Sequence, residues 1–255
     1  MDRQIKEKFL NLWRQYFGGA ELPVIFYYSL GPAGAERAKP PSKHRCFLID
    51  LAKVRRGESV CFDVDSLGCA GAKRYLGFSQ EIMPDFEYFL SCGIPGKLEG
   101  ERYKKSPELV QEAMKKMGQF QAPEPFIIFK RWDRIEGREH PDVVIFFAPP
   151  DVLSGLFTLA NFDEVDPNGV FAPFASGCAS IVQYPYFEKN SSRPRGVLGM
   201  FDVSARPWVS EDVLTFSLPM NKFLRMVENM EESFLMTSSW AMVKERITRK
   251  GAAAG

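Results

Sequence analysis

Two cysteines stand in matching small-residue settings, where a thiol could serve as a nucleophile or a ligand. Cys69 lies in the stretch SLGCAGAKRYLGF and Cys178 in FASGCASI. In both, Gly-Cys-Ala precedes a pattern typical of a helix, so each thiol is predicted at a helix N-terminus. Unpaired backbone N–H groups and the positive end of the helix dipole favour a thiolate there. We predict Cys69 as a catalytic residue; the alternative is that both cysteines are small side chains in tight turns.

The residues around these cysteines suit a small anionic ligand. Gly68 and Gly177 leave the neighbouring N–H groups accessible to an anion. Lys73 adds a positive charge one turn after Cys69. We therefore predict that Gly68, Gly177, Lys73 and Cys178 bind the ligand.

Three further polar residues lie at the ends of predicted strands. Lys130 occurs in FIIFKRWD, and Ser204 and Arg206 occur in FDVSARP. Arginine combined with serine and backbone donors can clamp a carboxylate or a phosphate. We predict all three as ligand-binding residues. The alternative for each cation is an ion pair within the chain.

Motifs for common metal, hydrolase and nucleotide chemistry do not occur. The sequence has no C-x-x-C, no histidine pair at helical spacing, no G-x-S-x-G, no P-loop and no G-x-G-x-x-G. We predict no metal ligand and leave the cofactor open. A site assembled in space from Cys69, Cys178 and either Cys61 or Asp63 remains an alternative.

The composition is that of an ordinary globular chain. It has 255 residues, of which 45% are hydrophobic and 25% charged, with a formal net charge of +1. This balance gives no electrostatic reason to expect a nucleic acid or a membrane as partner, and no basic run stands out. No apolar run approaches the roughly 20 residues that cross a bilayer. The five cysteines are an odd, dispersed set, which predicts reduced thiols in the cytoplasm.

Strand-like and helix-like patterns alternate along the chain. Runs rich in β-branched and aromatic residues predict strands at 23–29, 60–64, 126–132, 143–149, 196–203 and 213–219. Amphipathic patterns predict helices near the N-terminus, over 106–118 and after Pro219, the last continuing through Leu235. The fold class predicted is α+β, with mixed layers of helices and strands.

The order of landmarks suggests an internal duplication. GCAGAKRYLGF (68–78) matches GCASIVQYPYF (177–187) at five positions, VIFYYS matches VIFFAP, and LAKV (51–54) matches LANF (159–162). We predict two halves, 22–118 and 143–240, related by a pseudo-twofold axis with equivalent Gly-Cys-Ala turns. An N-terminal helix (1–21), a connecting strand and loop (119–142) and a C-terminal tail (241–255) complete the predicted organisation.

Motifs spread over nearly the whole chain resemble one family. They are CFDVDSLGCAGAKRYLGF, GERYKKSPELV, FKRWD, PFASGCASIV, GMFDVSARP and ESFLMTSSW. Together they resemble the uncharacterised prokaryotic family known as domain of unknown function 169. The resemblance implies an intracellular bacterial or archaeal protein. It implies no reaction and no catalytic residue.

These features favour a cytoplasmic protein that binds a small anionic ligand or cofactor in a cleft between its halves. The first alternative is a thiol-dependent enzyme, or a redox or metal protein, that uses Cys69. The second is a structural or adaptor protein without catalysis. A homo-oligomer stays open as well.

Overall fold

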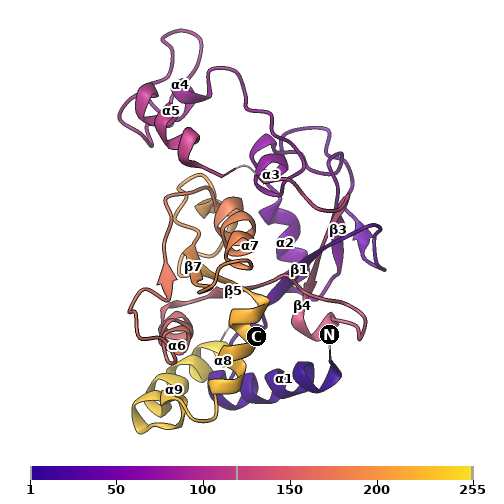
Figure 1. The fold of residues 1–255 in the computed structure, drawn as a ribbon, viewed down its shortest axis with the longest axis vertical. Coiled ribbons are helices and arrows are strands. Elements are labelled where there is room, and N and C mark those ends of the chain that lie inside the picture. Colours follow the sequence, from indigo (N-terminus) through magenta and orange to yellow (C-terminus); the bar gives the residue numbers. More distant parts are fainter. Residues whose placement is uncertain (1, 119, 254–255) are drawn as a thin grey trace.

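The computed structural model describes residues 2–118 and 120–253 (Figure 1). The strands are β1 (Val24–Ser29), β2 (Glu36–Arg37), β3 (Val60–Phe62), β4 (Phe126–Arg131), β5 (Val143–Ala148), β6 (Val170–Phe171), β7 (Gly196–Gly199) and β8 (Leu214–Pro219). The α-helices are α1 (Arg3–Phe17), α2 (Leu48–Arg55), α3 (Ala70–Tyr75), α4 (Phe86–Phe89), α5 (Pro107–Lys116), α6 (Pro150–Ala160), α7 (Tyr184–Glu188), α8 (Met220–Asn229) and α9 (Ser238–Ala253). The π-helix η2 (Ala179–Gln183) runs directly into α7, and short 3-10 helices are η1 (Trp132–Arg134), η3 (Arg206–Trp208) and η4 (Phe234–Met236).

One mixed sheet organises the described residues. Its eight strands lie in the order β2-β3-β4-β1-β5-β8-β7-β6. The two outermost pairs, β2 with β3 and β6 with β7, are parallel, and all other neighbouring pairs are antiparallel. The predicted α+β fold with mixed layers is confirmed.

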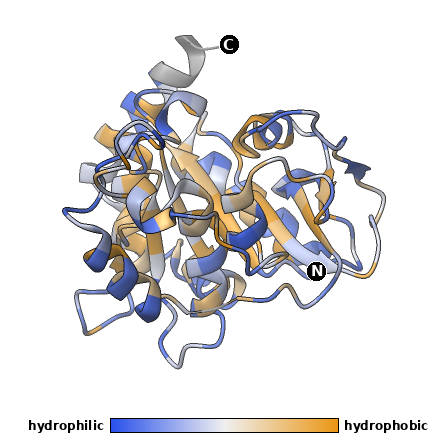
Figure 2. Cartoon of the chain, turned by 90° about the horizontal axis from the view of Figure 1, so that it is seen from above, coloured by the Kyte–Doolittle hydropathy of each residue, from blue (hydrophilic) through white to orange (hydrophobic). Residues whose placement is uncertain are grey.

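Helices cover both faces of the sheet because its central strands are apolar on both sides. Successive residues of a strand point to opposite faces. On β1, Ile25 faces the core formed with α1, α6, α8 and α9, whereas Val24 and Phe26 face the core formed with α2, α3 and η2. Figure 2 shows the strands as a hydrophobic centre surrounded by more hydrophilic loops. In Figure 1, α4 and α5 project away from these layers.

Local sequence signals account well for most of the elements. All six predicted strands are confirmed, with ends shifted by at most a few residues. In the predicted 106–118 helix, the Ser106 side chain accepts a hydrogen bond from the backbone N–H of Leu109, and Pro107 begins α5. The two-residue edge strands β2 and β6 were not predicted, because pairing alone defines them.

The helix predicted after Pro219 is shorter than its periodicity suggests. It ends at Asn229 with Met230 as its C-cap residue, and the later apolar positions Phe234 and Leu235 belong to η4. The hydroxyl of Ser233 donates to the carbonyl of Met230 and accepts from the N–H of Leu235. Such local side-chain hydrogen bonds compete with helical backbone pairing. The interruption also separates α8 from α9, which was not predicted.

The strand topology repeats within the chain. Starting from the central β1–β5 pair, the first four strands are ordered β1-β4-β3-β2 and the last four β5-β8-β7-β6. Matching pairs have the same relative direction: antiparallel, antiparallel, then parallel. The two sets form one continuous sheet, so no gap separates them at its centre.

The predicted equivalence of the two Gly-Cys-Ala turns is wrong. Cys69 precedes α3, which lies between β3 and β4, whereas Cys178 precedes η2, which lies between β6 and β7. By strand order, η2 corresponds to α2 instead. The strand β4, placed by us in a connection, belongs to the first set of four strands. Of the predicted C-terminal tail, residues 241–253 belong to α9, and 254–255 lie outside the described residues.

A buried ion network joins α8 to the loop that follows α6 and to the loop that precedes β7. The Lys222 side chain is completely buried, and its Nζ lies 2.6 Å from Glu164 and 3.7 Å from Asp163. Arg225 pairs with both carboxylates, and Arg193 donates to Glu164 at 3.0 Å. The network satisfies a charge that would otherwise be very costly to bury.

We expect this network to make the fold sensitive to acid. Burial raises the pKa of Glu164, but hydrogen bonds from Lys222 and Arg193 outweigh burial and hold it below its ordinary value of 4.5. The pKa of Asp163 is lowered in the same way, with Arg225 as the main partner. Carboxylates with depressed pKa values stabilise the fold above the unfolded-state pKa, and this stabilisation is lost as the pH falls through the folded-state value.

The melting temperature should therefore fall steeply once the pH drops below about 4.5. Thermal unfolding between neutral pH and pH 3 measures this effect. Glu164→Gln should be less stable at neutral pH and show a flatter decline in acid. An unchanged slope in this variant would show that other carboxylates control acid unfolding.

Candidate functional site

The loop before α2 lies across the turn that contains Gly68. A Cβ atom at Gly68 would clash with Cγ of Pro41 and would lie 3.2 Å from the N atom of Arg45 and from the O atom of Lys43. Only a glycine leaves room for the loop at this distance. Gly68 therefore allows residues 41–45 to rest on the start of α3.

A second glycine, Gly177, lies near the first residue of α2. A Cβ atom at Gly177 would lie 2.9 Å from Cβ of Ala205, 3.1 Å from Sδ of Met200 and 3.6 Å from Cδ1 of Leu48. The segment 41–48 is thus close to both the Gly68 turn and the Gly177 turn. The two turns are not equivalent in the fold, yet they meet at the same place.

Three thiols gather around this segment. Cys46 precedes α2, Cys69 is the N-cap residue of α3, and Cys178 is the N-cap residue of η2. The prediction that a helix begins just after Cys69 is confirmed. All three cysteines are partly buried against the core that covers this face of the sheet.

The thiols lie close enough to affect one another electrostatically. Burial raises the pKa of Cys46; the N–H of Leu48 opposes this shift, and the charges of Cys69 and Asp202 add to it. Burial also raises the pKa of Cys178 to about 12, with a lowering contribution from Ser176 and further raising contributions from Cys69 and Cys46. Cys69 therefore lies near both of the other thiols.

The start of η2 already binds an anion that the chain itself supplies. The N–H of Gly177 donates to Oδ2 of Asp202 at 3.0 Å, and the N–H of Ala179 donates to Oγ of Ser176 at 3.2 Å. Ser204 donates to Oδ1 of Asp202 from both its N–H and its hydroxyl. These donors hold the 200–208 loop against η2. The donors at Gly177 and Ser204 that we predicted for a ligand are thus engaged by Asp202.

The predicted cations are placed differently from one another. Lys130 is buried on the opposite face of the sheet, where its Nζ pairs with Glu139 at 2.5 Å. Arg206 donates to the carbonyl oxygens of Val213, Ser210 and Glu211, and so closes its own loop. Lys73 lies in the last turn of α3 and is partly exposed. The structure thus brings Cys69, Cys178, Gly68 and Gly177 together, but not Lys130.

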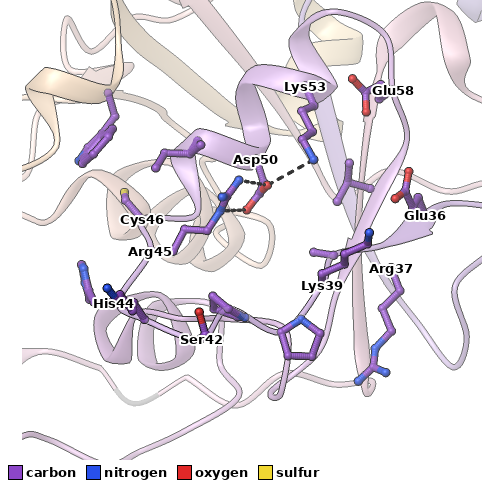
Figure 3. Close-up of a pocket in the computed structure, with 17 residues that line it drawn as sticks. Glu36, Arg37, Lys39, Ser42, His44, Arg45, Cys46, Asp50, Lys53 and Glu58 are labelled. Atoms are coloured by element: carbon purple, nitrogen blue, oxygen red, sulfur yellow. Dashed lines mark hydrogen bonds and ion pairs between the residues drawn. The ribbon is translucent and has the colours of Figure 1, made fainter.

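A basic groove opens beside Cys46 (Figure 3). Its volume is about 660 Å³, within the range of small-molecule sites. The lining comes from β2, the following loop, α2 and the start of β3, with one residue, Trp208, from η3 between β7 and β8. The charged and ring-bearing lining residues are Glu36, Arg37, Lys39, Lys43, His44, Arg45, Asp50, Lys53, Glu58 and Trp208.

Some of the groove's charges are neutralised by fixed partners. Arg45 forms a two-point hydrogen bond with Asp50, at 3.1 and 2.7 Å, and Arg37 pairs with Asp63 at 2.6 Å. Within the described part of the chain, no carboxylate lies within ion-pair distance of Lys39 or Lys43. In Figure 3, His44 and Cys46 lie on the opposite side of the groove from Glu36 and Glu58.

Sequence analysis missed this groove although its signal was present. The stretch RAKPPSKHRC (37–46) holds four Lys or Arg residues and one histidine in ten positions. We judged the chain by its overall charge balance, which conceals a local basic run. The adjacent prolines also mark this stretch as an extended loop. Nothing in the sequence near Trp208 indicated that it would reach the groove.

The comparisons with known proteins identify a family. The sequence model described as uncharacterised ArCR, domain of unknown function 169, matches residues 23–229. The chain belongs to this family. Like the earlier resemblance, membership of domain of unknown function 169 assigns no reaction. No curated protein and no solved structure matched the chain.

The described residues of this family member contain neither a metal-binding cluster nor a membrane-spanning helix. Over 2–118 and 120–253, no three or more His, Cys, Asp or Glu side chains are arranged to hold a metal ion. Across the same ranges, no helix has both the length and the apolar character to span a bilayer.

Proposed function

We propose that the chain binds a small anionic molecule with a flat ring in the groove between the 36–46 loop and α2. The observation that carries this proposal is the pair of lysines, Lys39 and Lys43, that line a groove of about 660 Å³ without carboxylate partners among the described residues. A ligand carboxylate, sulfonate or phosphate would supply the missing negative charge.

The fixed ion pairs support the same function. Asp50 holds the Arg45 guanidinium in a planar two-point contact, so the N–H groups on its other side are oriented before a ligand arrives. Lys53 lies 3.8 Å from the same carboxylate. The anionic group of the ligand would bind beside His44, which lies away from the carboxylates of Glu36 and Glu58 (Figure 3). Lys43 precedes His44 in the same loop and also lines the groove.

Trp208 supports a ring as the second part of the ligand. Its side chain is 47% exposed, whereas the other tryptophans, Trp13, Trp132 and Trp240, are at most 3% exposed. An exposed indole at the rim of a basic groove offers a face on which a flat ring can stack. A charged ring compound can therefore contact both the basic residues of the groove and Trp208.

Two dyes of similar shape test this function. Anilinonaphthalene sulfonate carries a ring system and a negative charge, and phenylnaphthylamine carries similar rings without the charge. We expect the sulfonate to bind in a salt-dependent manner and to protect Trp208 from acrylamide quenching. Lys43→Gln should weaken sulfonate binding about tenfold, which is the usual size of a lost charge-assisted contact.

The controls separate the groove from general dye binding. Lys97→Gln removes an exposed lysine that pairs with Asp85, at a site outside the groove, and should leave the affinity unchanged. Phenylnaphthylamine binding should not respond to Lys43→Gln. Equal loss in both lysine variants, or equal binding of the two dyes, would contradict the proposal.

We also infer that the chain arose by duplication, on the strength of the repeated strand topology and not of the Gly-Cys-Ala match. The equivalent segments would be 24–131 and 143–219, with β1 to β4 matching β5 to β8 in order. The antiparallel β1–β5 contact supports a pseudo-twofold axis between these strands. A superposition of the two segments should require a rotation near 180°; any other rotation contradicts the axis.

The five unpaired cysteines support a reducing, cytoplasmic compartment.

A further inference from the structure

We propose that Cys69 is a peroxide-reactive thiol that forms a disulfide bond with Cys46. The basis is positional: three thiols from three separate segments meet where the 41–48 loop crosses the Gly68 and Gly177 turns. Gly68 lies against the backbone of Lys43 and Arg45, and the next residue of each segment is Cys69 and Cys46 respectively. The groove proposal uses only Cys46, as part of the lining.

Cys69 has the setting of the attacking thiol. It is partly exposed, and its neighbours Gly68, Ala70 and Gly71 are too small to cover the sulfur. Its Sγ lies 3.6 Å from the position a Cβ of Gly71 would occupy, so it rests over the first turn of α3. As the N-cap residue it makes no side-chain hydrogen bond to this turn. No cap hydrogen bond therefore has to break before the sulfur reacts.

Cys46 is better placed than Cys178 to complete the bond. The Sγ atom of Cys178 contacts Oγ of Ser176 at 3.4 Å. Cys178 directly precedes η2, and the hydrogen bond from Gly177 to Asp202 holds this end of the helix in place. Burial also raises the pKa of Cys178 to about 12, which leaves almost no thiolate at neutral pH. Cys46 ends a loop without regular structure, which can adjust to disulfide geometry.

The chemistry has two steps and uses hydrogen peroxide as the oxidant. The Cys69 thiolate attacks one peroxide oxygen, the O–O bond breaks, and the products are a sulfenic acid and hydroxide, which takes up the proton released by the thiol to form water. The Cys46 sulfur then attacks the sulfenic sulfur, the S–O bond breaks, and a second water leaves. Two thiols are oxidised to one disulfide while one peroxide is reduced to two waters.

Because the pKa of Cys46 is raised by burial, the second step should be faster at alkaline than at neutral pH. The bond would also attach a lining residue of the groove to α3. This coupling to ligand binding rests on the proposed function, whereas the bond itself does not.

Peroxide treatment of the reduced full-length chain tests the bond. Titration of thiols in denaturant should fall from five to three, and mass spectrometry of a non-reduced digest should find the Cys46 peptide joined to the Cys69 peptide. Cys69→Ser should keep its remaining thiols reduced. In Cys46→Ser, the sulfenic acid should persist on Cys69 and react with dimedone.

Cys92→Ser and Cys178→Ser serve as controls, because the first removes an exposed thiol and the second removes the third member of the group. Both should still form the Cys46–Cys69 bond. A Cys69–Cys178 bond, an intermolecular bond through Cys92, or unchanged oxidation in Cys69→Ser would each overturn the assignment. Binding of anilinonaphthalene sulfonate before and after oxidation then reports on the groove separately.

Discussion

Replacing Lys222 with alanine should lower the free energy of unfolding by about 3–5 kcal/mol, which is the usual cost of breaking a buried ion pair from one side. The Lys222 side chain has no exposure, and it pairs with Glu164, whose side chain is 8% exposed. Without the ammonium group, Glu164 stays buried and loses its closest partner. Urea-induced unfolding followed by circular dichroism measures the change.

Lys97 provides a matched control for this prediction. It also forms a lysine–carboxylate pair, at 2.7 Å from Asp85, but its side chain is 66% exposed. Lys97→Ala should therefore change stability by no more than about 1 kcal/mol. Similar losses in both variants would mean that burial does not determine how much these ion pairs contribute to the free energy of unfolding. A small loss in Lys222→Ala would mean that Arg193 and Arg225 alone satisfy Glu164.

The sequence was most informative where a segment carries its own structural signal. The strands β1, β4, β5 and β8 are apolar runs rich in β-branched and aromatic residues, and each lies in the centre of the sheet. Ser106 and Pro107 marked the start of α5 through local capping chemistry alone. These signals depend on residues near in sequence, so no knowledge of the tertiary fold was needed.

The repeat was misjudged because similar sequences here serve different positions. Gly-Cys-Ala occurs twice since two separate turns need small residues, one beneath the 41–45 loop and one against Ala205 and Met200. The repeated element is instead the order and direction of strands, which five matching letters cannot reveal. Pairing of β1 with β5 is likewise a contact between segments more than a hundred residues apart.

In the candidate site, too, the sequence indicated what depends on neighbouring residues and missed what depends on contacts between distant segments. Sequence analysis selected Cys69 and Cys178 as the start of helices: Cys69 is the N-cap residue of α3, and Cys178 lies in the helical turn that leads into η2; their functional roles stay predictions. It missed the contribution of Cys46 and Asp202, since their proximity to these cysteines arises only from the fold. For Lys130 and Arg206, sequence analysis made the opposite error, since it predicted a ligand contact where the structure shows a contact within the chain. Each has a partner within the chain that the local sequence did not indicate.

Replacing Gly68 with alanine should impair ligand binding while the chain still folds. The new Cβ would clash with Pro41 and would lie 3.2 Å from backbone atoms of Lys43 and Arg45, so the loop must move away from α3. The displaced loop carries Lys43 and His44, which we place beside the anionic group of the ligand. We expect affinity for anilinonaphthalene sulfonate to fall about tenfold or more, with stability reduced by about 1–3 kcal/mol, as for an overpacked site.

Gly71→Ala is the matched control, three residues further along. Its Cβ would meet Sγ of Cys69 at 3.6 Å and the ring of Tyr75 at 3.9 Å, both ordinary contacts, and Gly71 lies within α3. Alanine favours a helix by about 0.5–1 kcal/mol over glycine, so this variant should be as stable as the original chain or more so, with unchanged dye affinity. The two substitutions add the same methyl group to the same turn, and they differ only in whether the 41–45 loop lies above it. If both leave binding intact, the position of that loop does not control the groove, and the anion must bind elsewhere.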